Sequence, residues 1–341
     1  MRLWTKILFA NILLLACGCL AIDFADNNVQ PITDSYYFLA YGHLFNIDPY
    51  EMNITLLHSF NPKAPTVALS PEGLFWARLS EKDLAAFNPQ SGKIEATVSL
   101  PLRPYNHIIT PNSKAYVTHH TLTDENFTVS VIDTYKKKFI GQIEHIFGLR
   151  TDIVYGNGYV YLATIGINRT DDLYLYQIDI QSDKLREIYN VPKEDYFWKI
   201  SYNSDSLYIC HLNLPKKSAA PIIEVMDIAK KTVCRTTNEL PGIKEILDRV
   251  TFDKNRAFLP CFTADDNYGI AMLDTYSIKV IKILHVTGAI YRIIGIKDDI
   301  LIYIDNPART GDKGMSLYFY DLREEKEVKT INIAQFLEAN Q

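Results

Sequence analysis

The chain has 341 residues, of which 48% are hydrophobic and 12% aromatic, with a formal net charge of −5 and a pI near 5.9. These values indicate a folded protein without the basic surface that nucleic acid requires, so we expect no nucleic-acid partner. A chain of this length often holds two domains, but the repeats described below predict one.

Residues Met1 to Ala21 have the pattern of an export signal. Arg2 and Lys6 form a positively charged start, and Ile7 to Ala16 form an apolar segment that is short for a membrane span. The stretch Leu14-Leu15-Ala16-Cys17 resembles a bacterial lipobox. We therefore expect residues 1–21 to be an export and lipoprotein signal with a short tether. In that case Cys17 is lipidated and anchors the protein to the bacterial cell envelope, on the periplasmic side or the outer surface.

Three alternatives to this interpretation of the N-terminus stay open. Cys19, which follows Gly18, is a second candidate for acylation. An ordinary cleaved signal would release the protein by secretion, and an uncleaved segment would act as an anchor.

The stretch from His107 to Glu144 predicts four short strands joined by three turns. An apolar segment ends at Thr110, a β-prone run covers Ala115 to Thr118, and Phe127 to Ile132 alternates apolar and polar residues. A fourth segment, from Phe139 to Ile143, closes the unit. One such sheet cannot bury its faces alone, so it predicts further copies in the chain.

Three sets of equivalent positions recur about every 40–50 residues, as in a β-propeller. The residues that end the third strand of each unit are Asp48, Asn88, Asp133, Asp179, Asp227, Asp274 and Asp321. The apolar residues inside the second strand are Tyr37, Phe75, Tyr116, Tyr161, Tyr208, Phe258 and Ile302. Those of the first strand are Val29, Val67, Ile108, Ile153, Ile200, Val250 and Ile294. We therefore predict an all-β fold, a seven-bladed β-propeller of four-stranded antiparallel blades that forms a single domain over residues 27–341.

One unit also resembles a known repeat. Pro111 to Thr118, followed by Val129 to Thr134, is similar to the YVTN-type repeat of YncE-like propeller proteins, although His119 stands where that signature has Asn. The other six units share only the pattern of apolar positions and the turn residue. The resemblance implies a propeller fold and a cell-envelope location, and it does not imply one activity.

The connections between the predicted strands differ in length on the two faces of the disc. Turns between first and second strands and between third and fourth strands are short, as at Pro111 to Ser113. Connections between second and third strands and between blades are long, as at Leu212 to Pro221 and at Asn238 to Asp248, where Pro241 to Leu247 could form a short helix. Binding residues concentrate on such loops. We therefore expect the long-loop face to be the working face.

Residues at the start of the first strands should surround the mouth of the central channel on that face. The candidate ligand-binding residues there are Tyr105, His107, Arg150, Trp198, Lys199, Arg249, Tyr291 and Arg292. Arginine suits carboxylate or phosphate, and the aromatic residues offer stacking area. The alternative is that the cations pair with Asp152 and Asp248 and fill a solvated channel.

No catalytic motif is present, and we assign no catalytic residue, metal site or cofactor. His119 and His120 with Asp124 and Glu125 are poor metal ligands, because neighbouring strand residues face opposite ways. The sequence favours a non-enzymatic, monomeric binding or scaffold protein for an envelope protein, a peptide or a small anionic ligand. The alternative is a propeller enzyme, lactonase-like or similar to a quinoprotein dehydrogenase, acting at the central channel.

Overall fold

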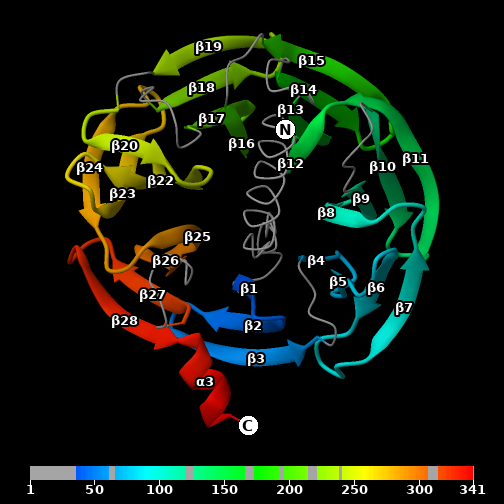
Figure 1. Cartoon of the computed structure of the whole chain (residues 1–341), viewed down its shortest axis with the longest axis horizontal. Coiled ribbons are helices and arrows are strands. Elements are labelled where there is room, and N and C mark those ends of the chain that lie inside the picture. Colours follow the sequence, from blue (N-terminus) through cyan, green and yellow to red (C-terminus); the bar gives the residue numbers. More distant parts are fainter. Residues whose placement is uncertain are drawn as a thin grey trace, which may run out of the picture.

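Seven antiparallel sheets form a closed ring around a central axis (Figure 1). The computed structural model describes residues 36–60, 66–119, 126–165, 173–191, 196–213, 221–237, 240–305 and 314–340. Each sheet is built from consecutive strands whose order in the sheet follows the chain, so each is one blade. The chain is a seven-bladed β-propeller, as the three sets of recurring positions predict.

The strands of the first four blades follow the chain in order. Blade 1 holds β1 (Tyr36–Ala40), β2 (His43–Asp48) and β3 (Asn53–Ser59). Blade 2 holds β4 (Val67–Leu69), β5 (Phe75–Arg78), β6 (Asp83–Phe87) and β7 (Ile94–Ser99). Blade 3 holds β8 (Pro104–Thr110), β9 (Lys114–His119), β10 (Asn126–Asp133) and β11 (Lys138–Phe147). Blade 4 holds β12 (Leu149–Gly156), β13 (Tyr159–Ile165), β14 (Leu173–Asp179) and β15 (Leu185–Val191).

The remaining three blades complete the ring. Blade 5 holds β16 (Tyr196–Asn203), β17 (Ser206–Asn213), β18 (Ile222–Asp227) and β19 (Thr232–Thr237). Blade 6 holds β20 (Ile243–Ile246), β21 (Thr251–Asp253), β22 (Arg256–Thr263), β23 (Tyr268–Asp274) and β24 (Val280–His285). Blade 7 holds β25 (Ile290–Lys297), β26 (Ile300–Asp305), β27 (Ser316–Asp321) and β28 (Lys326–Asn332), and the helix α3 (Ile333–Ala339) follows.

Two blades depart from the four-stranded pattern. Blade 1 has three described strands, and its predicted innermost strand around Val29 lies outside the described residues. In blade 6 the innermost position is divided between β20 and β21, which both pair with β22. Val250 lies in the break between them and is buried, so the prediction that it sits within a strand was wrong although its core position is right. The segment Pro241 to Leu247 contains β20 and not the expected helix.

Each interface between neighbouring blades contains its own apolar core. The buried side chains fall into seven clusters, and every cluster joins residues of two adjacent blades. The second strands lie inside the sheets and are covered on both faces, so they read as continuous apolar runs, such as Val160 to Ala163 in β13. The outermost strands alternate instead, as in β19, because one face meets solvent. Stacking of blades therefore supplies the core that one sheet lacks.

The recurring Asp or Asn at the end of the third strand forms the same turn in all seven blades. Its side-chain oxygen accepts hydrogen bonds from backbone N–H groups two or three residues later. In blade 4, for example, Asp179 Oδ1 accepts from Gln181 and Ser182, both at 2.9 Å. The other six blades repeat this contact at Asp48, Asn88, Asp133, Asp227, Asp274 and Asp321. These residues are turn formers, as their side-chain chemistry predicts.

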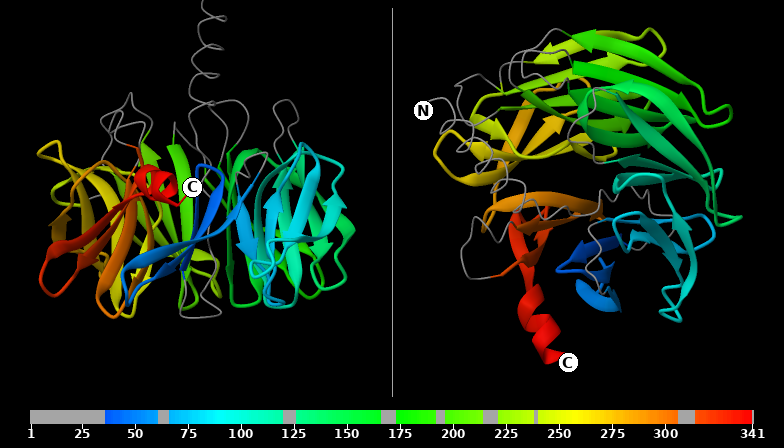
Figure 2. Two further views of the ribbon diagram at one scale, coloured as in Figure 1. Left: turned by 90° about the horizontal axis from the view of Figure 1, so that it is seen from below. Right: turned by 45° about the vertical axis from the view of Figure 1, so that its right-hand side comes forward.

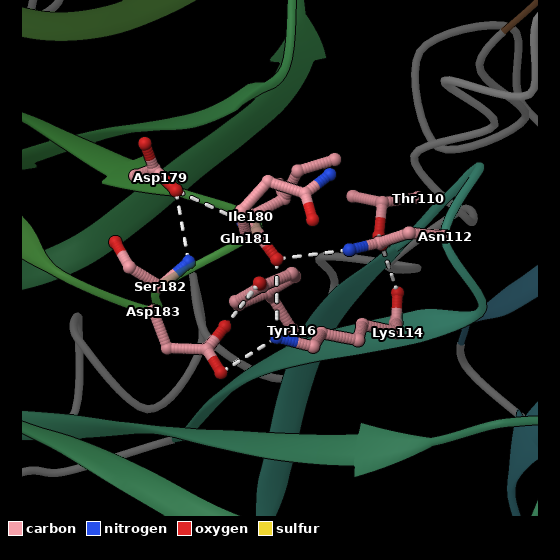
Figure 3. A network of polar contacts seen from close by, with 9 residues as sticks. All are labelled: Thr110, Asn112, Lys114, Tyr116, Asp179, Ile180, Gln181, Ser182 and Asp183. Carbon is pink, nitrogen blue, oxygen red and sulfur yellow. Dashed lines mark hydrogen bonds and ion pairs between the residues drawn. The ribbon is translucent and has the colours of Figure 1, made fainter.

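Polar contacts on the short-turn face connect neighbouring blades. Between blades 3 and 4, Lys114 Nζ lies 2.7 Å from Asp183 Oδ2, and the Tyr116 hydroxyl donates to Asp183 Oδ1 at 2.5 Å (Figure 3). Asn112 and Lys114 also donate to the carbonyl of Ile180. These contacts hold the third-to-fourth turn of one blade against the inner strands of its neighbour.

The ring closes where blade 7 meets blade 1, and each of these blades is built from its own consecutive strands. The Tyr36 hydroxyl donates to the Ile296 carbonyl at 2.7 Å, and the Met315 N–H donates to the Tyr41 hydroxyl at 2.7 Å. Helix α3 begins after Asn332, whose side chain caps it by accepting from the Gln335 N–H. Its residue Ile333 is fully buried in the core shared by the two blades. Figure 1 shows α3 at this junction.

Candidate functional site at the channel mouth

The first strands of the blades line the axis and run from one face of the disc to the other (Figures 1 and 2). In an antiparallel blade, the start of the first strand lies on the same face as the connection between second and third strands. The first residues of β8, β12, β16 and β25, together with the segment before β21, therefore meet at one mouth of the channel.

Asp152 connects three blades at this mouth. Its Oδ1 lies 2.5 Å from Arg249 Nη2 of blade 6 and 3.8 Å from Lys199 Nζ of blade 5. Its Oδ2 accepts the backbone N–H of Ile200 at 2.8 Å. The carboxylate is buried, with 3% of its side chain exposed, so these contacts offset the cost of removing its charge from water.

A second ion pair continues the same row of charges. Arg292 Nε of blade 7 lies 2.9 Å from Asp248 Oδ2 of blade 6, and its guanidinium lies 5.7 Å from the centre of the Tyr291 ring. Below the charges, the Ser201 hydroxyl donates to the Val250 carbonyl at 2.8 Å. Burial raises the pKa of the nearby Cys210 thiol to about 12, so this group is neutral at pH 7.

Three described cations gather at the mouth. Lys199 and Arg249 lie beside Asp152, and Arg292 lies beside Asp248. Each arginine side chain is 11% exposed, whereas that of Lys199 is 28% exposed. The arginines are thus held mainly by protein carboxylates, and Lys199 is the cation that an arriving anion can reach most easily.

The structure places the other candidate residues differently. His107 is buried between blades 2 and 3, where its Nε2 donates to the Trp76 carbonyl at 3.1 Å and its Nδ1 lies 3.3 Å from Thr66 Oγ1. Burial lowers the pKa of His107 to about 4. It therefore belongs to the wall between two blades. Tyr105 is half-buried at the start of β8.

Three of the predicted residues, Arg150, Trp198 and Cys17, lie where the structure describes less. Arg150 and Trp198 lie on β12 and β16, but their side chains are outside the described part of the structure. Cys17 and the whole signal segment precede residue 36 and are also outside it.

His119, which the sequence analysis considered as a metal ligand, makes hydrogen-bonding contacts within blade 3 instead. His119 is buried, and its Nε2 lies 2.7 Å from Ser130 Oγ while its Nδ1 lies 3.2 Å from the Arg103 carbonyl. Its expected partners at 120–125 are outside the described residues. Among the side chains that the structure describes, no group of three His, Cys, Asp or Glu residues is arranged to hold a metal ion.

Sequence reasoning missed two features of the surface. One is α3, which has a sequence signal in the capping residue Asn332 and in apolar residues at 333, 336 and 337. The other is a small pocket between blades 1 and 2, which has no sequence signal because residues of four different strands and their flanks line it. Within the described residues, no helix has the length and apolar character needed to cross a membrane.

No family model matches the chain, and no curated protein sequence matches it. Solved structures do match. The computationally designed Ika8 protein has a TM-score of 0.61 and 10% identity, over 88% of this chain and 84% of its own. Hydrazine synthase of Kuenenia stuttgartiensis has a TM-score of 0.59 and 12% identity, over 87% and 92%. The dihydro-heme d1 dehydrogenase NirN, in complex with DHE, has a TM-score of 0.52 and 12% identity, over 87% and 73%. At such identities the likeness concerns the fold alone.

Proposed function

We propose that this protein is a non-enzymatic binding or scaffold propeller of the bacterial cell envelope. It is exported, lipidated at Cys17, and binds an envelope protein, a peptide or a small anionic ligand at the channel mouth and the long-loop face. The export signal and the lipobox-like sequence support the location.

The observation that carries the binding proposal is that Lys199, Arg249 and Arg292 gather at one mouth of the channel. Lys199 lies 3.8 Å from a carboxylate that a closer arginine and a backbone N–H already contact. An anionic group arriving at the mouth would approach Lys199 at lower cost than it would displace Asp152 from Arg249. Partial enclosure by the ring lowers the effective dielectric and strengthens this attraction.

Co-purification from envelope extracts tests the proposal. Wild-type protein, Lys199→Glu and the control Lys230→Glu are immobilised, and bound proteins and small molecules are identified by mass spectrometry. We expect a partner that is retained by wild type and by Lys230→Glu and is lost with Lys199→Glu. Lys230 is a suitable control because it lies on an exposed turn of blade 5 and pairs with Asp227. Equal retention by all three proteins would contradict a role for the mouth.

The alternative is a propeller enzyme acting at the central channel. Two of the similar structures are enzymes by their names, hydrazine synthase and a dihydro-heme d1 dehydrogenase. An absorbance spectrum and a metal analysis of protein purified from its native host test this alternative. A stoichiometric chromophore or metal would favour it over the binding proposal.

A further inference from the structure

The junction between blades 1 and 2 is built from stacked rings. The Tyr37 and Phe75 rings lie 4.8 Å apart, edge to face, across the junction. His58 stacks on Phe87 at 4.8 Å, and Phe60 meets the same Phe87 ring at 5.1 Å. Rings of both blades therefore meet at this junction.

A pocket of about 210 Å³ lies at this junction. Its lining includes His58 and Phe60 of blade 1 and Leu79, Phe87 and Ile94 of blade 2. Sites for drug-sized ligands usually occupy about 300–1,000 Å³, whereas an apolar cavity of about 150 Å³ is enough for benzene. The pocket thus has the size of one ring or one branched apolar side chain and is too small for a cofactor.

The chemistry of the lining favours an uncharged ring. Five of the seven lining side chains are hydrocarbon, and the other two are Ser59 and His58. Burial lowers the pKa of His58 below its usual value, so His58 is neutral at pH 7. Aromatic pairs gain energy beyond the burial of area when their edges and faces meet. The walls include the rings of His58, Phe60 and Phe87, against which an entering ring could pack.

The lip of the pocket is exposed, and the residue that follows it in the chain contacts a lysine-rich turn. Ile94 is 53% exposed at the lip. The next residue, Glu95, lies 2.6 Å from Lys137 Nζ on the third-to-fourth turn of blade 3. On that turn Tyr135 is 73% exposed and the Lys136 side chain 62% exposed.

This turn and its surroundings carry a local positive surplus. The lysines are Lys93, Lys136, Lys137 and Lys138, and the carboxylates that contact this turn or its neighbours are Glu72, Glu95 and Asp133. Four cations against three anions leave one positive charge, in a chain whose net charge is −5. An acidic partner would be repelled by most of this protein and attracted here.

We propose that the pocket and the lysine turn together form a docking site for an acidic segment of a partner protein. One aromatic side chain of that segment enters the pocket between blades 1 and 2, and flanking carboxylates lie over Lys136 and Lys138. Anchoring by one buried ring with a charged rim is a common division of roles in interfaces. The site lies away from the channel mouth and does not depend on what binds there.

Two short peptides test this site. Fluorescein-labelled Asp-Glu-Phe-Asp-Glu and Asp-Glu-Ala-Asp-Glu are titrated with the protein, and fluorescence polarisation gives the dissociation constants at low and high salt. We expect the Phe peptide to bind roughly tenfold more tightly than the Ala peptide, because one buried aromatic ring is worth about one such factor or more. Higher salt should weaken both. Equal affinity of the two peptides, or no binding up to about 1 mM, would overturn the proposal.

Matched variants locate the binding. Ile94→Asp places a charge at the lip, and its control Ile281→Asp changes an equally exposed isoleucine on the outer strand of blade 6. Lys136→Glu reverses a charge on the turn, and its control Lys230→Glu changes the equivalent turn position of blade 5, where the same ion pair is 3.1 Å long. All four positions are exposed, so circular dichroism should be unchanged. We expect Ile94→Asp and Lys136→Glu to weaken the binding of the Phe peptide at least several-fold, and the two controls to leave its dissociation constant unchanged.

A membrane surface is the competing occupant. The exposed ring of Tyr135 beside lysines also suits anionic headgroups. Vesicles of phosphatidylcholine with and without phosphatidylglycerol are therefore sedimented with wild type and Lys136→Glu. Binding that requires phosphatidylglycerol and Lys136, without discrimination between the two peptides, would assign the turn to a lipid surface and overturn the peptide site.

Discussion

Arg249 Nη2 and Asp152 Oδ1 lie 2.5 Å apart although their blades, 6 and 4, are not neighbours. Both residues lie at the mouth of the central channel. Asp152 at the same time accepts the Ile200 N–H of the intervening blade 5. One buried carboxylate therefore connects the innermost segments of three blades.

Replacing Arg249 with Leu should destabilise the protein. Asp152 would keep its charge in a buried position, and Lys199 lies farther from it than Arg249 does. Breaking a buried pair in this way costs about 3 kcal/mol. Urea unfolding measures the free energy of unfolding. The double variant Arg249→Leu/Asp152→Asn should recover more than about 1 kcal/mol, because the buried carboxylate that lost its partner is then neutral as well. A loss below about 0.5 kcal/mol in the single variant would show that the pair contributes little.

A glycine substitution in the turns after the third strands should stabilise the protein. The residue four places after each turn Asp or Asn has a positive φ in all seven blades, and six of the seven are not glycine. Lys231 is the exposed example in blade 5, with φ of 54°. A left-handed conformation costs about 1–2 kcal/mol for a residue with a Cβ, of which the extra flexibility of unfolded glycine cancels part.

We therefore expect Lys231→Gly to raise the free energy of unfolding by about 0.5 kcal/mol or more. Its control, Ala229→Gly, changes a residue of the same turn that lacks a positive φ, and should lower that free energy. Thermal melting of both variants is the measurement. If both lower the melting temperature, the turn is not strained at Lys231.

His107 should make the protein less stable between pH 6.5 and about 4. Burial lowers its folded-state pKa to about 4, whereas the unfolded value is near 6.5. Because the unfolded state binds the proton first, stability is complete above pH 6.5, falls as the pH drops toward 4, and levels off below. The loss is on the order of 3 kcal/mol, and His119, whose pKa burial also lowers to about 4, adds to it.

His107→Gln tests this assignment, since glutamine keeps a donor for Trp76 and does not titrate. Urea midpoints at pH 7 and 4.5 should differ less in the variant than in wild type. An unchanged difference would place the acid sensitivity elsewhere.

The C-terminal helix should contribute to closing the ring. Ile333 is fully buried and packs in the core between blades 7 and 1. Ile333→Ala should cost about 2–4 kcal/mol, as for other large-to-small changes in a core. Glu338→Ala on the exposed side of α3 is the control and should be within about 0.5 kcal/mol of wild type. If the two variants melt alike, α3 does not stabilise the junction.

The architecture could be read from the sequence because it is repeated. The turn residue makes the same side-chain contact once in each of the seven blades. Asp133 and Asp274, for example, each accept a backbone N–H three residues later. The first strand of blade 6 was harder to predict from the sequence, because Val250 keeps its core position while the strand around it is broken. Helix α3 was missed although Asn332 and the spacing of Ile333, Phe336 and Leu337 carry a helix signal.

The candidate site was predicted only in part. The position of Lys199, Arg249 and Arg292 around one mouth follows from the ring symmetry. The partner of each cation does not, because Arg249 reaches past the nearest blade to Asp152. His107 shares the position of these residues in the repeat, yet its side chain turns into the blade interface, where Thr66 and the Trp76 carbonyl contact it.

The central claim is that the channel mouth captures a partner, and site-specific photo-crosslinking tests it most directly. A photoreactive phenylalanine is introduced in place of Tyr105 at the mouth or, as a control, in place of Tyr276, an exposed ring on a turn of blade 6. Both proteins are irradiated in envelope extract with and without the additional change Lys199→Glu. We predict a covalent adduct at position 105 that is absent at 276 and is lost with Lys199→Glu. Equal adducts at both positions, or an adduct at 105 that is insensitive to Lys199→Glu, would contradict the account.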